Sequence, residues 1–197
     1  MPETYKNVRR TVMGASRPYW APIKTESDSA LPTYDTGMAF SEFIKLTENL
    51  SLAETEFYSD DTLSENAKEF KYCELTYDNK GLSDEIMQKM FGMDYTDGVL
   101  TYGADDNAPF GGFGYYRTLM DKAVKYYEGV FYPKVKGALS GDTTDTRGEN
   151  VSFAGTSTSL TAYACKDTRR TWKKTQIFKT AEEAESWVKT QLGIAGT

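Results

Sequence analysis

PFGGFGYYRTLMDKAVKYYEGVFYPKV, residues 109–135, is the stretch on which the interpretation of the fold depends. Its glycines are followed by runs of Tyr, Phe and Val, residue types that suit the pleated and half-buried surface of a β-sheet. Glu128 and Gly129 offer a turn between two such runs. We therefore predict a strand, a loop and a hairpin for this stretch.

The same glycines could instead cradle a phosphate, as glycine-rich loops do at the start of a helix. Gly112 and Gly114 match the first two glycines of a dinucleotide-binding fingerprint, but Arg117 stands where the third glycine is needed. The sequence also contains no Gly-Lys-Ser or Gly-Lys-Thr, which excludes a Walker loop. The glycines are therefore assigned to structure and not to phosphate binding.

The length and composition predict a folded protein of one ordinary domain or of one domain with long appendages. Of its 197 residues, 39% are hydrophobic and 26% are charged, a balance that argues against wholesale disorder. The longest apolar run is far shorter than the roughly 20 residues that span a bilayer, and the N-terminus lacks an apolar signal core. We expect no membrane association and folding in the cytosol. Cys73 and Cys165 lie in strand-like runs, which predicts buried thiols and no disulfide.

Histidine is absent from the sequence, which removes the commonest general base and the commonest metal ligand. The acidic residues are scattered, and they give no pair that the sequence alone could nominate for carboxylate catalysis. We therefore expect no enzyme and no cofactor, and we predict no catalytic, metal-binding or cofactor-binding residue. The formal net charge of −6 also argues against tight nucleic-acid binding, because such affinity comes mainly from Lys and Arg.

The N-terminal region, residues 1–37, contains most of the prolines and no persistent helical period. It is interpreted as an extended N-terminal arm with loops, preceding a single domain over residues 38–197. Aromatic and basic side chains on such an arm favour docking onto an acidic partner, with a nucleic-acid patch or a plain solvated arm as alternatives. The candidate docking residues are Tyr5, Arg9, Arg10, Tyr19 and Trp20.

Two strand patterns follow the arm. In FKYCELTYD, residues 70–78, the side chains of Cys73, Leu75 and Tyr77 alternate with polar ones, which predicts a half-buried strand. Upstream, Glu48-Asn49 is a possible turn that would fold residues 43–58 into a hairpin. The apolar residues expected to share one face there are Ile44, Leu46, Leu50 and Leu52.

The segment from Tyr58 to Glu69 is acidic and contains little that could anchor a core. It fits either a solvated loop or a projecting hairpin that becomes ordered against a partner. Further along, Asp97-Gly98 is a strong hairpin turn signal, and a loop over residues 140–150 is expected to join two strands.

Two helices are predicted, near residues 83–91 and 181–192. Ser83 is the expected N-cap of the first helix, and Gly92 occupies its C-terminal αL position. Thr180 and Glu183 form a capping box at the start of the second helix. The predicted fold class is therefore mainly β (α+β), an antiparallel β-sandwich or barrel with two flanking helices.

The order of these elements resembles the major tail proteins, or tail tube proteins, of long-tailed bacteriophages over residues 20–170. The resemblance rests on the acidic turn that begins with Phe57 and Tyr58, on the strand and short capped helix over residues 70–92, and on the strand entry Pro109-Phe110-Gly111. It implies that Phe57, Tyr58, Asp60, Asp61 and Glu65 form an acidic element that contacts a neighbouring ring or lines the lumen.

The resemblance also implies a function. Subunits of this family assemble as stacked, hexameric rings into the phage tail tube, through which double-stranded DNA passes during genome delivery. It implies a virion protein that is made and assembled in the host bacterial cytoplasm, with tape measure, tail tip and terminator proteins as further partners. An acidic lumen would repel phosphates and let DNA slide without specific binding. The pattern fits a flexible tail, the inner tube of a contractile tail or a bacteriocin tube equally well.

Two other readings remain open at the level of sequence. A monomeric β-sandwich that binds a carbohydrate or another protein would use the same aromatic and acidic surface residues. A carboxylate enzyme would need Asp or Glu side chains to converge in a deep pocket. Self-association separates the first of these readings from a tube subunit.

Overall fold

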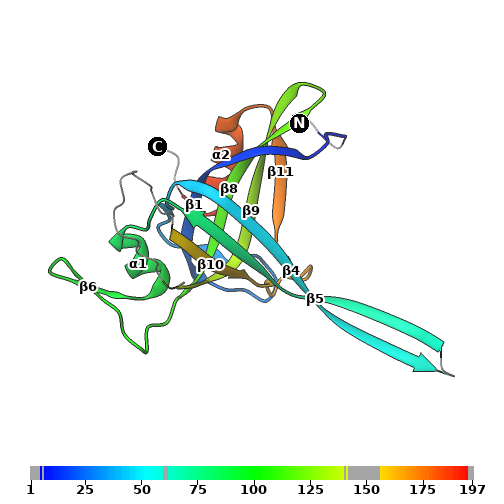
Figure 1. The fold of residues 1–197 in the computed structure, drawn as a ribbon, viewed down its shortest axis with the longest axis horizontal. Helices are drawn as coiled ribbons and strands as arrows, with labels where there is room; N and C mark the ends of the chain where they lie inside the picture. The colour runs from blue at the N-terminus through cyan, green and yellow to red at the C-terminus, as the bar shows by residue number, and fades with distance from the viewer. Residues whose placement is uncertain (1–4, 6, 60–61, 140, 142–155, 195–197) are drawn as a thin grey trace, which may run out of the picture.

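The computed structural model describes residues 5, 7–59, 62–139, 141 and 156–194 (Figure 1). In this part of the chain the fold is mainly β, with a nine-stranded sheet in the order β2-β1-β8-β9-β10-β5-β4 and all its pairings antiparallel. Two short strands attach beside this path, β3 to β1 and β11 to β9, while β6 and β7 form a separate hairpin.

The sheet is made from long strands and short edge pieces. Its strands are β1 (Thr11–Thr25), β2 (Thr33–Tyr34), β3 (Met38–Ala39), β4 (Phe43–Ser59), β5 (Thr62–Asn79), β8 (Phe110–Asp121), β9 (Val124–Ala138), β10 (Thr156–Ala162) and β11 (Lys174–Phe178). The separate hairpin consists of β6 (Asp94–Thr96) and β7 (Val99–Thr101), and the two helices are α1 (Asp84–Phe91) and α2 (Ala181–Gln191).

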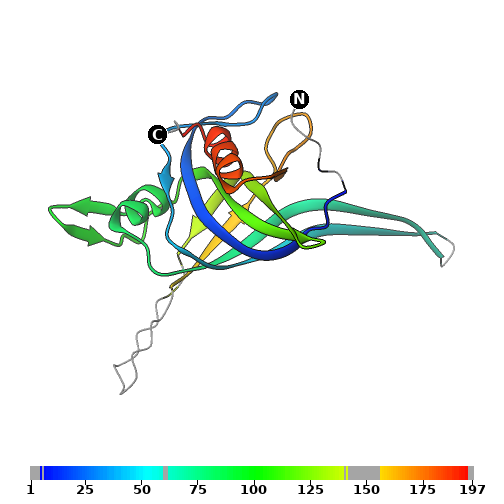
Figure 2. The same ribbon diagram turned by 90° about the horizontal axis from the view of Figure 1, so that it is seen from above.

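The sheet curls strongly upon itself. Tyr77 of β5 and Phe113 of β8 are separated by two strands, a distance of about 14 Å in a flat sheet, yet their ring centroids lie 6.0 Å apart. Phe43 of β4 and Tyr115 of β8 are still further apart in strand order, and their rings lie 5.3 Å apart. The sheet is therefore an open barrel, whose curvature is visible in Figure 2.

The main core fills the concave side of this sheet, where α1 also contributes. The alternation predicted in β5 is confirmed, because Cys73, Leu75 and Tyr77 are completely buried there. The buried residues of this core are Trp20, Phe40, Cys73, Leu75, Tyr77, Ile86, Met90, Phe91, Met93, Phe113, Tyr115, Val130, Tyr132, Val135, Leu160 and Ala162.

Helix α2 packs on the opposite, convex face, over β8 and β9. Val188 and Leu192 contact Phe131 and Ala21 in a second, smaller core. The glycines of the opening stretch make this close approach possible: a Cβ at Gly114 would lie 2.7 Å from Val188, and one at Gly129 would lie 2.6 Å from Trp187. The absence of a side chain at these glycines therefore allows α2 to pack directly against β8 and β9.

Both predicted helices are confirmed, with their caps. The Ser83 side chain accepts a hydrogen bond from the amide of Ile86, and Gly92 adopts φ 80° at the C-terminus of α1. Thr180 and Glu183 make the predicted capping box of α2. The turn at Asp97-Gly98 between β6 and β7 is also present.

The predicted N-terminal arm is wrong for residues 11–25. This segment is β1, which pairs with β8 along most of its length, so residues 11–25 belong to the same sheet as the later strands. Pro18 falls where the register between β1 and β8 shifts, and a β-bulge is a position that tolerates a residue without an N–H donor. High proline content therefore did not mean an unpaired segment.

Two predicted turns are also wrong. The β8–β9 turn lies at Lys122-Ala123, and Glu128-Gly129 is inside β9. Glu48-Asn49 is inside the continuous strand β4, where Tyr132 donates a 2.8 Å hydrogen bond to the Glu48 carboxylate. Of the apolar face predicted upstream, Leu46 is half-buried, whereas the other three residues are exposed: Ile44, Leu50 and Leu52.

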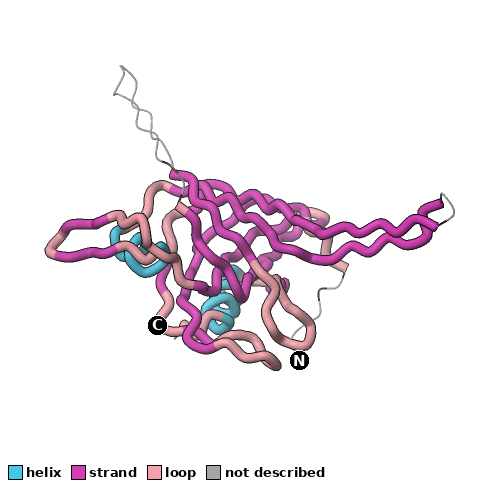
Figure 3. Tube along the Cα trace, turned by 90° about the horizontal axis from the view of Figure 1, so that it is seen from below, coloured by secondary structure: helices cyan, strands magenta, loops and turns pink. Residues whose placement is uncertain are grey.

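Strands β4 and β5 form a hairpin that leaves the body of the protein (Figures 1 and 3). Their pairing continues to Ser59 and Thr62, so the acidic segment 58–69 is the end of two strands, with residues 60–61 outside the described part. The β6–β7 hairpin lies at the other end of the long axis (Figure 1). The predicted loop over residues 140–150 lies almost entirely outside the described residues.

Among the described residues, no helix is long and apolar enough to cross a membrane.

Candidate assembly surfaces

The predicted docking residues of the N-terminal region are mostly engaged within their own chain. Trp20 is 1% exposed in the main core, and the Tyr19 hydroxyl donates a 2.6 Å hydrogen bond to Glu185. The amide of Arg9 donates to Asp121, and the ring of Tyr5 lies 5.7 Å from that of Tyr126. Trp20 is therefore wrong as a candidate for contact with a partner, because it is buried in its own chain, whereas Tyr19 is half-buried and its candidacy stays a prediction.

Arg10, the remaining candidate, takes part in an ionic cluster that the sequence did not indicate. The Glu128 side chain is completely buried and accepts hydrogen bonds from Arg10 Nε at 2.8 Å and Arg117 Nε at 2.7 Å. Burial lowers the pKa of Arg117, but the Glu128 carboxylate outweighs this and holds it above its usual range. Because a buried carboxylate is costly unless paired, this cluster fixes the start of β1 to β8 and β9.

A second ionic cluster joins β1 to α2. Glu185 accepts hydrogen bonds from Arg17 at 2.6 Å and from Tyr19, and it pairs with Lys189 at 3.0 Å. Burial raises the pKa of Glu185, but the hydrogen bonds from Tyr19 and Lys189 and the nearby positive charges bring it below its ordinary value. Arg17 has φ 50° at the β1 bulge, so the ion pair holds a backbone conformation that is uncommon for a residue other than glycine.

The long hairpin carries the acidic candidates. Phe57 pairs with Glu65, and Tyr58 pairs with Leu63, so these three predicted residues lie on the projecting strands. Asp60 and Asp61 lie outside the described residues. Because the strand pairing continues to Ser59 and Thr62, the hairpin carries these positions away from the body (Figure 3).

Strand β4 is the end of the strand order, and β5 is its partner in the sheet. Leu50 and Leu52, near the root of the hairpin, are 51% and 46% exposed, and they pair with Cys73 and Phe70. Paired residues share a face, so both leucines continue the concave face beyond the main core. A long edge strand with exposed apolar side chains is a ready template for pairing with another chain.

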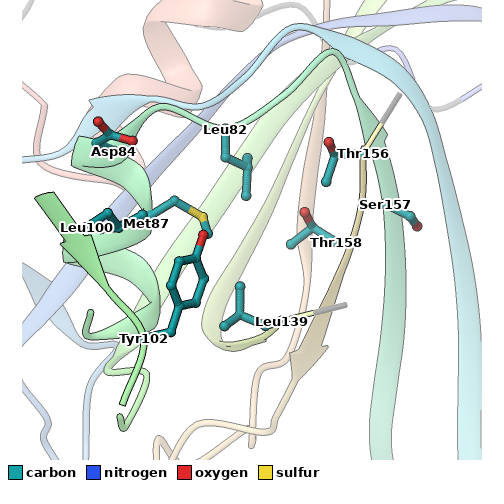
Figure 4. Close-up of a pocket in the computed structure, with 9 residues that line it drawn as sticks. All are labelled: Leu82, Asp84, Met87, Leu100, Tyr102, Leu139, Thr156, Ser157 and Thr158. Atoms are coloured by element: carbon teal, nitrogen blue, oxygen red, sulfur yellow. The ribbon is translucent and has the colours of Figure 1, made fainter. Parts of the chain in front are cut away.

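An open pocket of about 440 Å³ lies where α1 and β7 face the adjoining ends of β9 and β10 (Figure 4). Met87 and Tyr102 lie on one side of it, and Leu139 and Thr158 on the other. Its lining is Leu82, Asp84, Met87, Leu100, Tyr102, Leu139, Thr156, Ser157 and Thr158. Asp84 is the one carboxylate among them, so the lining offers no pair of acids for glycoside chemistry.

The described residues include no group of three or more His, Cys, Asp or Glu side chains placed to hold a metal ion. The two cysteines are buried and free, as predicted. Burial raises the pKa of the Cys73 thiol to about 11 and that of Cys165 to about 12, so neither is an activated nucleophile.

No protein-family model matches the chain, and no curated protein matches it either. The surfaces described above are therefore the basis for the assignment of function.

Proposed function

We propose that this protein is a structural subunit that assembles with copies of itself into a tube, as tail tube proteins of long-tailed bacteriophages do. Stacked rings, hexameric in the form that the sequence resemblance implies, would surround a channel for double-stranded DNA. The observation that carries this proposal is the β4–β5 hairpin, which continues strand pairing well beyond the core and exposes a sheet edge with apolar side chains.

The energetics of the hairpin support assembly. A two-stranded hairpin is marginally stable by itself in water. The exposed Leu50 and Leu52 would lose their contact with water if β4 paired with a strand of a neighbouring copy. A pairing that repeats around a ring covers every such edge, and the open barrel of each copy then becomes part of a closed wall.

The charge supports a passage for DNA and argues against a binding site for it. A net charge of −6 on each copy repels phosphates at long range, so DNA would pass an assembly of such copies without binding tightly to it. The proposed setting is a virion, with assembly in the host cytoplasm and with tape measure, tail tip and terminator proteins as further partners. We propose no catalytic role.

The test is negative-stain electron microscopy of the purified protein over a range of concentrations. Rings or tubes with a central channel are the expected result. A monodisperse monomer at every concentration, with a tail tip complex added as well, would contradict the proposal.

The second candidate function is a monomeric binding module, which the pocket of Figure 4 favours. Tyr102 is 63% exposed at its rim, and aromatic side chains at an open pocket suit carbohydrate or protein ligands. A Tyr102→Ala variant separates the two candidates. It should leave self-association unchanged in a tube subunit, whereas a binding module should lose its ligand and show no self-association at all.

A further inference from the structure

The β4–β5 hairpin leaves the body at a β-bulge. Strand β10 pairs with β5 only as far as Cys73, and beyond this point β5 pairs with β4 alone (Figure 1). The register of the two strands shifts at the same place, between Ser51 and Leu52, which leaves Lys71 as the extra residue. A bulge bends a strand and increases its twist. The hairpin therefore loses its neighbouring strand at a position where it is able to bend.

An aromatic stack connects the outer side of this bulge to the core. The ring of Trp172 lies nearly parallel to that of Phe70 in β5, with ring centroids 4.9 Å apart and an interplanar angle of 16°. Trp172 also contacts Tyr132 of β9, at 6.4 Å between ring centroids. Phe70 lies on the hairpin side of Lys71, whereas Tyr132 is completely buried in the main core. The indole therefore joins the hairpin to the body across the bulge.

Lys173 holds this stack against the body. Its ammonium group donates to the Glu48 carboxylate at 2.5 Å, and Glu48 also accepts a 2.8 Å hydrogen bond from Tyr132. Burial raises the pKa of the Tyr132 hydroxyl, so this group remains a donor. The Lys173 and Glu48 side chains are 18% and 29% exposed, so solvent screens this pair less than it screens a pair on the surface. We call Trp172 and Lys173 the brace.

The segment that carries the brace is itself fixed. It connects β10 to β11, and its Asp167 carboxylate accepts hydrogen bonds at 2.8 Å from both the amide and the hydroxyl of Thr171. The amide of Cys165 donates to the Thr171 carbonyl at 3.0 Å. Strand β11 begins directly after the brace, where Lys174 pairs with Phe131 of β9. The brace therefore has a defined position relative to the sheet.

We propose that the brace sets the direction in which the β4–β5 hairpin leaves the body, and that this fixed direction is required for self-association. The proposal rests on the proposed function, because it concerns the hairpin that is assigned to assembly there. Trp172 contacts the hairpin at its root, and Lys173 holds Trp172 in place. Both are positioning residues, since they act through the hairpin.

The length of the hairpin makes its direction important. The paired strands from Leu52 to Ser59 span about 25 Å at the rise of a β-strand. A tilt of about 10° at the bulge would move the far end by roughly 4 Å, which approaches the spacing of about 4.8 Å between neighbouring strands. A hairpin that tilted by this amount would meet a neighbouring copy out of register. Fixing the direction in advance also lowers the ordering cost of association.

Single-molecule fluorescence energy transfer measures the direction of the hairpin in one copy. Dyes are attached at Ser59→Cys, at the far end of the hairpin, and at Lys24→Cys, which is exposed on β1. Cys73 and Cys165 are buried, so labelling is confined to the introduced thiols. Picomolar concentrations keep the copies apart during the measurement. We expect one narrow distribution of transfer efficiency with the brace intact, and a broader or shifted one in Trp172→Ala.

Self-association is measured in the same variants without dyes. Trp172→Ala should raise the concentration needed for assembly about tenfold, because the stack on Phe70 is lost. Lys173→Met keeps the aliphatic stem but removes the ion pair, and it should have a smaller effect in the same direction. Trp172→Phe retains a ring that can stack on Phe70, so it should restore both the narrow distribution and assembly.

Trp187→Ala is the matched control. Trp187 is also a half-buried tryptophan, but it packs against the second core, where its ring lies 6.1 Å from that of Phe178. Its truncation should destabilise the body without changing the fluorescence distribution or the concentration needed for assembly. Chemical denaturation establishes that both alanine variants are folded under the conditions of the two measurements.

The outcomes separate the brace from the tube. An unchanged fluorescence distribution in Trp172→Ala would overturn the brace, as would an equal change in Trp187→Ala, which would trace the effect to general destabilisation. A broader distribution with unchanged assembly would overturn the requirement for a fixed direction. A wild type that never assembles, together with a distribution that broadens in Trp172→Ala, would overturn the tube subunit and its assembly requirement but support the direction set by the brace.

Discussion

Strand β5 passes through two different environments. Its second half, from Cys73 to Asn79, lies between β4 and β10, and alternate side chains are completely buried. Its first half pairs with β4 alone and extends away from the body (Figure 1). The body half contributes completely buried side chains to the main core, whereas Lys68 and Glu69 on the projecting half are exposed, so the two halves of one strand have different roles.

We therefore expect the body to determine the stability of one chain and the hairpin to determine self-association. Substitutions in the body should change the free energy of unfolding, because they alter contacts made within one chain. Substitutions in the hairpin should change self-association and leave the free energy of unfolding nearly unaltered.

The largest expected effect is that of Leu75→Ala. Leu75 is completely buried in β5, and its truncation should lower the free energy of unfolding by about 3 kcal/mol. Leu52→Ala is the matched control on the neighbouring strand, where the side chain is 46% exposed, and it should cost less than about 0.5 kcal/mol. Urea denaturation measures both, and equal losses would show that the hairpin root is part of the core.

Glu128→Gln should be the next most destabilising change. It removes the buried negative charge between Arg10 and Arg117 and should cost about 2 kcal/mol, less than a fully buried pair because Arg10 is exposed. Thermal unfolding checks this value. Glu54→Gln, in an exposed pair with Lys68 on the hairpin, is the control and should leave the melting temperature within about 1 °C. A neutral Glu128→Gln variant would contradict the role given to this cluster.

Gly114→Ala tests the packing of α2 against β8. The added Cβ would lie 2.7 Å from Val188, which should destabilise the protein by about 1–2 kcal/mol. Gly14→Ala in β1 is the control, since nothing lies within 4 Å of its Cβ, and it should be neutral or slightly stabilising. Chemical denaturation should therefore show a lower free energy of unfolding for Gly114→Ala and no loss for Gly14→Ala, and equal losses would contradict the close contact given to Gly114.

The smallest predicted effect concerns pH. The pKa of Glu185 is depressed in the folded state, so its contribution is fully present above its ordinary value of 4.5 and is lost as pH falls through the folded pKa. Wild type and Glu185→Gln should therefore differ in melting temperature at pH 7 and converge as the pH falls through the folded-state pKa of Glu185. A difference that grows toward low pH would contradict this assignment.

Short sequence patterns correctly predicted the features that depend on neighbouring residues, namely one buried strand face and the two helix caps. The alternation of Cys73, Leu75 and Tyr77 identified the buried face of β5, and the caps at Ser83 and Thr180 identified the start of each helix. In these places a few neighbouring residues fix the conformation, because the alternation and the capping hydrogen bonds are both short-range. The sequence was sufficient there.

The errors arose where distant residues decide. The β8–β9 turn has positive φ at Lys122 and Ala123, 47° and 65°, where glycine or asparagine would have signalled a tight turn. The prolines of β1 suggested an arm, because the bulge that accommodates Pro18 depends on β8. Glu128 gave no signal, since its partner Arg10 lies 118 positions away.

The predicted assembly surfaces also divide into features that the local sequence reveals and features that depend on distant residues. The acidic segment was recognised from its composition, and its strands project from the body. Trp20 was misassigned because the residues around an aromatic side chain in the sequence do not reveal whether its own chain will cover it. The pairing that buries Trp20 against β8 becomes visible only in the folded protein.

The most direct test of the separation between body and hairpin replaces residues 53–69 by a two-residue Asn-Gly turn. Leu52 and Phe70 already pair, so the shortened hairpin can close without disturbing the body. Electron microscopy and thermal unfolding of the variant and the wild type at matched concentration then give the answer. We predict rings or tubes for the wild type, and monomers with an unchanged melting temperature for the variant. A variant that still forms tubes, or one that no longer folds, would contradict the account.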